Sequence, residues 1–387
     1  MKLMRLGFIK RLFIVCLAFG MFGVNTITYA DESGSIESEN LFINLTDLRE
    51  AFINESIEFR DLKENIVDLD QSADASEKTI FYRSDSPSGI KDQRKGSYYE
   101  YAYPTFVQLE NLKTQVDVLD NTKDITETTL SYSADQLLSN YSLLKKQLEL
   151  YDKMVEKTEQ TYAASEKKYE LGSISKMDLE TSQVELENLK YNRDKIQYSM
   201  ENVMYNMMKL AGLEFGKEYR FQEPVFTEIE FSESNFGSYY EAALEVSKDV
   251  ANANREMDAL ENEGKYVKLY HSSILKSDLL DFDRRYEEGK QAQEIAQNEV
   301  YQSLRSYLSE FNKLSDEISV ADIQIKYDKN NLAKLAQMEK MGQVVDTDRQ
   351  SYEIKVFQSE IEKMSLMNEK LLLSQKIDLL VSYGIKL

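Results

Sequence analysis

Apolar and neutral residues recur alternately three and four positions apart along several long stretches of this chain. In the first stretch the repeating positions are Leu137, Tyr141, Leu144, Leu148, Tyr151, Val155, Thr158, Tyr162 and Tyr169. A second stretch has Leu179, Leu186, Leu189, Ile196, Met200, Val203, Met207 and Leu210, and a third has Leu304, Leu308, Phe311, Leu314, Ile318, Ile325, Leu332 and Leu335. This is the spacing of a heptad seam, so each stretch is expected to be a long helix that packs against another helix.

Helix-breaking residues separate these stretches at wide intervals. The bounding breakers are Pro104, Gly172 and Gly212 in the first half, and Gly289, Gly342 and Gly384 in the second. Between neighbouring breakers in each half the chain holds no glycine or proline, which suits uninterrupted helices. The sequence therefore predicts an all-α fold of two tandem, long, antiparallel helical hairpins.

The two predicted hairpin tips resemble each other in sequence. Gly172–Asp178 reads Gly-Ser-Ile-Ser-Lys-Met-Asp, and Gly342–Asp348 reads Gly-Gln-Val-Val-Asp-Thr-Asp. A left-handed glycine can end the first helix, and Ser175 with Asp178 forms the pattern of a capping box that starts the next. Ile174 is expected to be exposed, either as a docking point for a partner or as a hydrophobic staple onto the following helix.

At the second tip the corresponding cap is Asp346 or Thr347, and Val344 and Val345 are the exposed apolar pair.

The last stretch carries two apolar stripes on neighbouring faces. One stripe is Ile354, Phe357, Ile361, Met364 and Leu371, and the other is Tyr352, Val356, Leu366, Leu373, Ile377 and Leu380. A helix with two apolar faces has two helical neighbours, which favours a layer of helices. The core of a four-helix bundle is the alternative.

The predicted organisation has four parts, of which the leader is the first. They are a signal peptide at 1–30, a first hairpin repeat at 31–211, a linker at 212–237 and a second hairpin repeat at 238–387. Residues 71–104 form the main irregular segment, in which Thr79–Arg83 and Ser97–Tyr103 could make one short β-hairpin.

The first thirty residues have the layout of a secretory signal: a basic start, an apolar centre from Leu12 to Val24, and Thr28-Tyr29-Ala30 before the expected cleavage site. An uncleaved anchor is the alternative. Removal of the leader changes the formal charge from −21 to −25, because it takes away four basic and no acidic residues. Nucleic acid is therefore an unlikely partner class. Cys16, the single cysteine, lies in the leader, so the mature chain cannot form an internal disulfide.

This sequence contains few residues that are candidates for catalysis. His271 is the single histidine, and the mature chain has no cysteine to act as nucleophile or zinc ligand. No spacing typical of a calcium loop occurs, so no catalytic residue, metal site or cofactor is expected. The tyrosines recur on the heptad seams and are expected to pack in the core. We therefore expect a protein that is not an enzyme.

Two stretches at the tips and two helix ends resemble the TolC family of outer-membrane efflux proteins. The stretches are Tyr162–Leu179 and Gln337–Asp348, and the helix ends are the Ala-Gly-Leu that finishes at Leu213 and the Tyr-Gly-Ile that finishes at Ile385. The resemblance covers about residues 45–387, apart from the irregular segment and its counterpart around 264–288.

The resemblance implies a homotrimer whose protomers enclose a hollow α-barrel. It also implies that the hairpin tips dock onto an adaptor protein, which links the duct to an energised pump such as an ABC exporter. Carried over to this sequence, the docking tips are Gly172, Ser173, Ile174, Asp178, Gly342, Gln343, Val344 and Asp348. Asp348 also matches the acidic ring at the family's narrow entrance, whereas Ser351 and Val344 depart from the family pattern, so a charge-latched entrance does not follow.

A family protomer also supplies four membrane-spanning strands, for which this chain has little room. Gly264–Gly289, at the place of two of them, is short and rich in charge. We therefore expect a duct-like protein that lacks most of the membrane β-barrel. Its expected location is the cell envelope outside the cytoplasm, in an outer membrane if one exists and otherwise at the cell surface. A coiled-coil structural or surface interaction protein that conducts nothing is the alternative function.

Overall fold

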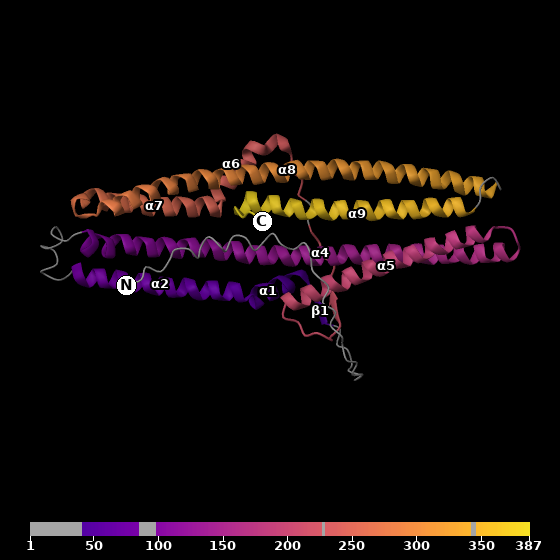
Figure 1. Ribbon diagram of the computed structural model, residues 1–387, viewed down its shortest axis with the longest axis horizontal. Helices are drawn as coiled ribbons and strands as arrows, with labels where there is room; N and C mark the ends of the chain where they lie inside the picture. The colour runs from indigo at the N-terminus through magenta and orange to yellow at the C-terminus, as the bar shows by residue number, and fades with distance from the viewer. Residues whose placement is uncertain (1–40, 85–97, 227–228, 342–345) are drawn as a thin grey trace. The chain divides into compact units, whose positions relative to one another are not determined.

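The computed structural model describes residues 41–84, 98–226, 229–341 and 346–387 (Figure 1). The first half contains β1 (Leu41–Ile43), α1 (Leu45–Glu55), α2 (Ile57–Ser84), η2 (Tyr98–Val107), α4 (Gln108–Glu170), α5 (Lys176–Leu210) and β2 (Tyr219–Phe221). The second half contains η3 (Glu233–Asn235), α6 (Phe236–Val246), α7 (Lys248–Leu269), η4 (His271–Ser273), α8 (Lys276–Lys340) and α9 (Asp346–Tyr383). The predicted all-α fold with two long hairpins, α4–α5 and α8–α9, is confirmed.

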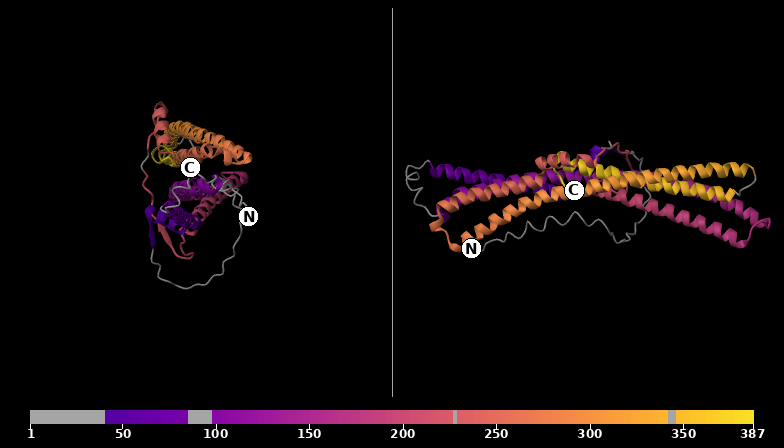
Figure 2. Two further views of the ribbon diagram at one scale, coloured as in Figure 1. Left: turned by 90° about the vertical axis from the view of Figure 1, so that its left-hand side faces the viewer. Right: turned by 90° about the horizontal axis from the view of Figure 1, so that it is seen from above.

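The four long helices pack in the order α5, α4, α9, α8. Helix α4 contacts α5 on one side and α9 on the other, and α9 contacts α4 and α8. Beyond the ends of α5 and α9, α4 packs against α2 and α7, and α7 packs against α8. In the part of the chain that the structure describes, α5 and α8 share little or no contact. The arrangement is a layer with two open edges rather than a bundle closed around one core. The turn between α4 and α5 lies at the same end of this layer as the end of α8 and the start of α9 (Figures 1 and 2).

Each half of the chain has its own hydrophobic core. The first contains Leu48 and Phe52 of α1, Leu138 of α4 and Met207 of α5, all nearly or fully buried. The second is built in the same way from α6, α7, α8 and α9, and its fully buried residues include Ala243, Leu304 and Ile377. The predicted seams supply Leu304, Leu308 and Phe311 of the second core, whereas in the first core they supply only Met207 among the buried residues. An amphipathic helix is stabilised mainly by burying its apolar stripe.

Polar contacts join the two halves along α4. Gln147 Nε2 of α4 donates to Ser365 Oγ of α9 at 3.0 Å, and Lys157 Nζ lies 2.5 Å from Glu353 Oε2. Further along α4, Asn121 Nδ2 donates to Asn252 Oδ1 of α7 at 2.6 Å. Directional side-chain hydrogen bonds of this kind fix the register between the two halves more closely than apolar contact would.

Both halves end their return helix in the same way. Gly212 follows α5 with φ +62°, and Gly384 follows α9 with φ +67°. Gly212 lies against the side chain of Glu55 at the end of α1, whereas Gly384 lies against the backbone of Val246 at the end of α6. The Gly384 carbonyl also accepts a hydrogen bond from the N–H of Lys248 at 3.1 Å. The repeat seen in the sequence therefore includes this joint between the return helix and the short leading helix.

The predicted irregular segment 71–104 is wrong over its described part. Residues 71–84 continue α2, and Tyr98–Val107 form a π-helix that leads directly into α4. Pro104 lies inside this π-helix. The missing N–H of a proline is better tolerated where wide turns already replace the regular hydrogen-bond ladder, so it does not end the helix here. The short β-hairpin predicted from Thr79–Arg83 and Ser97–Tyr103 is also wrong, because Thr79–Arg83 lie in α2 and Tyr98–Tyr103 lie in the π-helix. The two described strands, β1 and β2, instead pair in parallel, with Phe42 opposite Arg220.

Gly264 and Gly289 are not helix breakers, which corrects the predicted start of the second hairpin. Gly264 lies in α7 and Gly289 in α8, so the long helix begins at Lys276. A Cβ on Gly289 would lie 2.9 Å from Leu260 Cδ1, and one on Gly264 would lie 3.1 Å from Phe282 Cζ. Both glycines therefore allow α7 and α8 to approach closely. The predicted leader, 1–30, lies outside the described residues and stays a prediction.

Candidate functional site

The first hairpin tip is a tight turn closed by backbone hydrogen bonds. The N–H of Gly172 donates to the Tyr169 carbonyl at 2.9 Å, and the N–H of Ser173 donates to the Lys168 carbonyl at 2.8 Å. Gly172 has φ +71°, the left-handed conformation that glycine adopts without steric cost. These features make a Schellman motif at the end of α4, as the position of Gly172 predicts.

The next helix, α5, starts with the predicted capping box. The N–H of Asp178 donates to Ser175 Oγ at 3.2 Å, and Asp178 Oδ2 accepts from the N–H of Ser175 at 3.0 Å. The hydrogen bonds from the Ser175 side chain and backbone lower the pKa of Asp178, since they favour its carboxylate form. Asp178 therefore holds the turn in shape, as the predicted capping box requires, and its docking role stays a prediction.

Ile174 takes the position of a hydrophobic staple, one of its two predicted roles, and the exposed apolar surface of this tip lies elsewhere. Ile174 is half-buried, as is Leu179, and these two occupy the positions of a hydrophobic staple. The exposed apolar side chains are instead Leu171 and Met177, which are 81% and 72% exposed. The sequence indicated the turn but not the exposure of Leu171, which follows the last predicted seam position, Tyr169, and caps the end of α4.

The second tip is described only at its two flanks. Gly342, Gln343, Val344 and Val345 lie outside the described residues, and Asp348 lies in the first turn of α9. Met341, the last residue before the turn, is 62% exposed. Arg349 of α9 lies 2.8 Å from Glu339 of α8 and 2.8 Å from Glu353, so an ion pair joins the two arms just behind the tip. The docking role of this tip and the acidic ring at Asp348 stay predictions.

The outer face of α5 carries an exposed apolar stripe. Its members are Met177, Val184, Tyr191, Tyr198 and Tyr205, spaced seven residues apart, and they are 72%, 59%, 70%, 63% and 49% exposed. We call this set the α5 stripe. A strict seven-residue repeat is the pattern of a seam for another helix. In the described chain this face is largely exposed, and Phe215, which follows α5, lies against Tyr205 with ring centroids 6.4 Å apart. The prediction that tyrosines on the seams pack in the core is wrong for Tyr191, Tyr198 and Tyr205.

Helix α8, at the other edge of the layer, carries a second exposed set. Val320, Ile323 and Tyr327 are 66%, 70% and 58% exposed and follow the three-and-four spacing of a helix face. We call this set the α8 stripe. A single chain thus leaves apolar surface at both edges of its helix layer, where it would be covered if the edges met between copies.

The two stripes lie at about the same level along the layer. The contacts that connect successive helices at this level are Arg193–Asp152, Gln147–Ser365 and Lys363–Asp322, at 2.9, 3.0 and 2.5 Å. Reading across these contacts, Tyr198 of α5 is nearly level with Val320 of α8. Two copies placed side by side would therefore bring one stripe against the other.

Other kinds of site were sought in the same residues. No group of three or more His, Cys, Asp or Glu side chains in the described ranges is placed to hold a metal ion. His271 is exposed in η4, between α7 and α8. None of the helices that the structure describes is both long and apolar enough to cross a membrane.

Comparison by sequence alone finds no relatives: no family model matches the chain, and no curated protein sequence matches it. Comparison by structure finds matches. The fold matches the CusC transmembrane channel with a TM-score of 0.68 at 12% identity, over 90% of this chain and 95% of that one. The chain has a TolC-like fold. The CmeC outer-membrane channel of Campylobacter jejuni also matches, with a TM-score of 0.67 at 10% identity, over 95% of this chain and 94% of that one.

VceC, an outer-membrane protein of Vibrio cholerae, matches the TolC-like fold as well, with a TM-score of 0.68 at 11% identity over 88% of this chain and 95% of that one. These matches extend over nearly the whole length of each channel protomer. In this TolC-like fold, the predicted tip at Gly172, Ser173, Ile174 and Asp178 is a hairpin tip between α4 and α5. The α5 stripe was the feature that the sequence analysis missed, although the seven-residue spacing of Tyr191, Tyr198 and Tyr205 could have revealed it.

Proposed function

We propose that this chain is the protomer of a duct in an export or efflux system of the cell envelope, and that three copies form its wall. The TolC-like fold supports this proposal, because the solved structures that share it are channel proteins. The open layer of four long helices adds to it, since such a layer can form one segment of a tube whereas a closed bundle cannot.

The observation that carries the proposal is the pair of exposed apolar stripes. The α5 stripe and the α8 stripe lie on opposite edges of one layer, so a contact between them is heterologous and repeats from copy to copy. Heterologous contacts generate a ring when the rotation between copies closes. A closed ring would cover both edges of every protomer and leave no apolar stripe in water.

The hairpin tips are the proposed docking end of the duct. Leu171 and Met177 stand out among neighbours of both signs, including Lys167, Glu170 and Lys176. An exposed apolar centre with a mixed charged rim is the anatomy of a protein–protein contact. The proposed partner is an adaptor protein linked to a membrane pump, and the proposed location is the envelope outside the cytoplasm.

The alternative function is a structural or surface interaction protein that keeps the helices but conducts nothing. The acidic composition alone would fit it, because a solvated acidic surface needs no channel. The alternative does not account for apolar stripes on both edges of the layer.

Docking can be tested by placing a photo-crosslinking amino acid at Leu171 in cells that express the chain. The expected product joins the chain to a membrane-anchored extracytoplasmic protein that co-purifies with a pump. The matched control is the same probe at Val225, which is 92% exposed in the linker between the two halves and should give no such product. Equal products from both positions, or none from Leu171, would contradict docking through the tip.

A further inference from the structure

The turn between α7 and α8 exposes two leucines at the far end of α8 from the hairpin tip. Helix α7 ends at Leu269, η4 follows at His271–Ser273, and α8 begins at Lys276. Leu269 and Leu275 flank the turn and are 73% and 64% exposed. Figure 1 shows this turn where the orange helices reverse, away from the α8–α9 tip.

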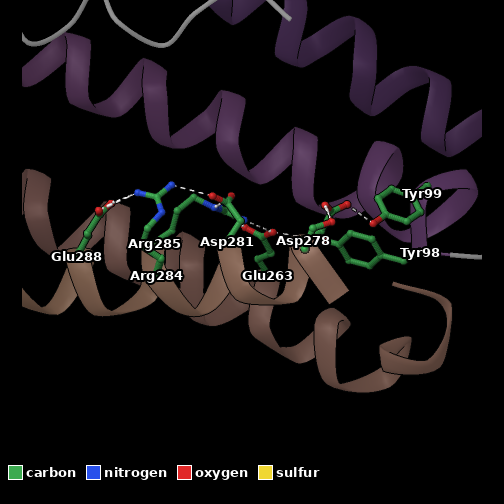
Figure 3. Close-up of polar contacts among 9 residues, drawn as sticks. Tyr98, Tyr99, Glu263, Asp278, Asp281, Arg284, Arg285 and Glu288 are labelled. Carbon is green, nitrogen blue, oxygen red and sulfur yellow. Dashed lines mark hydrogen bonds and ion pairs between the residues drawn. The ribbon is translucent and has the colours of Figure 1, made fainter. Parts of the chain in front are cut away.

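The turn is held rigidly, so this exposure belongs to a fixed surface. Tyr98 of η2 donates from its hydroxyl to Glu263 Oε1 of α7 at 3.0 Å, and Arg285 of α8 donates to both oxygens of the same carboxylate at 2.8 Å (Figure 3). Burial and the Glu263 carboxylate raise the pKa of Tyr98, which keeps its hydroxyl protonated as a donor.

Two further hydrogen bonds attach η2 to the turn itself. The backbone N–H of Tyr98 donates to Ser273 Oγ at 3.2 Å, and the N–H of Leu275 donates to the Tyr99 hydroxyl oxygen at 3.3 Å. The Tyr99 hydroxyl in turn donates to the Asp278 carboxylate. The two leucines are thus presented by a turn that is bonded to three helical elements.

The charge around these leucines differs from that of the rest of the chain. From Gly264 to Ser277 there is no acidic residue, although the whole chain has 68. The same fourteen positions contain Lys265, Lys268 and Lys276, and all three side chains are exposed. The first acidic neighbour, Asp278, is engaged by Tyr99, and Asp281 pairs with Arg284 at 2.7 Å.

We propose that the α7–α8 turn binds the surface of a lipid membrane that contains anionic headgroups. Leu269 and Leu275 would enter the boundary between headgroups and acyl chains, while the lysines reach the phosphates with their flexible stems. An apolar turn that carries only positive charge, on a chain with a formal charge of −21, matches an anionic surface. The leucine at the first hairpin tip, Leu171, has Glu166, Glu170 and Asp178 close in sequence and suits a protein instead.

The test is flotation of the mature chain with vesicles of phosphatidylglycerol and phosphatidylcholine in equal parts. The wild-type chain should float with these vesicles, more weakly with phosphatidylcholine alone, and more weakly at high salt, because the contribution of each lysine is screened. The variant Leu269→Glu with Leu275→Glu should lower the partition coefficient at least about tenfold, since two apolar anchors become charged. Replacing Lys265, Lys268 and Lys276 with glutamine should lower it roughly fivefold per lysine on anionic vesicles only.

The matched control is Leu171→Glu with Met341→Glu, which makes the same change at one exposed apolar position beside each hairpin tip, outside the α5 and α8 stripes. It should float like the wild type. Helix content by circular dichroism and copy number by native mass should be equal for all variants, which separates this test from that of the duct. A wild-type chain that does not float, or a Leu269→Glu, Leu275→Glu variant that floats as well as the wild type, would overturn the proposal.

Discussion

Replacing Gly384 with alanine is expected to destabilise the second half of the chain by about 3 kcal/mol or more. The added Cβ would lie 2.0 Å from the Val246 carbonyl oxygen, and both partners are backbone, so no side-chain movement relieves the overlap. The φ of +67° at Gly384 adds the cost of a left-handed conformation, about 1–2 kcal/mol for an alanine. Urea unfolding followed by circular dichroism would measure the change in unfolding free energy.

Three other glycines provide a graded control for this result. Gly172 and Gly216 have positive φ but nothing within 4 Å of a Cβ, so alanine there should cost only about 1–2 kcal/mol. Gly212 should be intermediate, because its Cβ would lie 2.8 Å from the Glu55 side chain, which can move. A loss at Gly384 no greater than the loss at Gly172 would show that the contact with α6 does not constrain this joint.

Changing Tyr191 and Tyr198 together to glutamate is expected to separate the assembled protein into single copies. Each glutamate would put a charge into an apolar seam between two protomers, where an unpaired charge is strongly unfavourable. The two changes together should raise the dissociation constant between copies by roughly two orders of magnitude or more. Helix content should stay unchanged, because both side chains are exposed in a single chain. Mass photometry over a range of protein concentrations would measure the shift.

Tyr169→Glu is the matched control, since Tyr169 is also an exposed tyrosine on a long helix, at 41%, but lies at the tip and outside the α5 stripe. It should leave the number of copies unchanged. Dissociation by Tyr169→Glu as complete as that by the double change would mean that added charge, rather than the stripe, controls assembly.

The sequence predicted the long helices well because their signal is local and repeated. The three-and-four spacing from Leu304 to Leu314 matches the buried face of α8, and Ser175 with Asp178 forms the capping box at the predicted place. The two apolar faces of the last helix also predicted correctly that α9 has helical neighbours on both sides, α4 and α8.

The wrong predictions of helix ends concern glycine and proline, which can end a helix in one setting and lie inside one in another. Gly289 was taken as a helix end because glycine lowers helix propensity, but here its small size admits Leu260 from α7. Pro104 was taken as a breaker, but the wide turns of a π-helix accommodate it. Local patterns cannot distinguish these cases, because the deciding partner lies elsewhere in the chain.

The sequence predicted where the candidate site lies but not which of its apolar side chains are exposed. Ile174 was expected to be exposed and is half-buried, whereas Leu171 and Met177 face solvent. The periodicity of Tyr191, Tyr198 and Tyr205 was visible in the sequence, but it does not say whether a seam is filled within one chain or between copies. Only the neighbours of α5 in the fold decide that.

The most direct test of this account is single-particle imaging of the mature wild-type chain, because its central claim is that α5 of one copy meets α8 of the next. The account predicts a closed ring of three copies around a central hole, with Tyr198 facing the Val320 region of the neighbouring copy. Single copies, or an assembly in which the α5 and α8 stripes stay exposed around a filled centre, would contradict it.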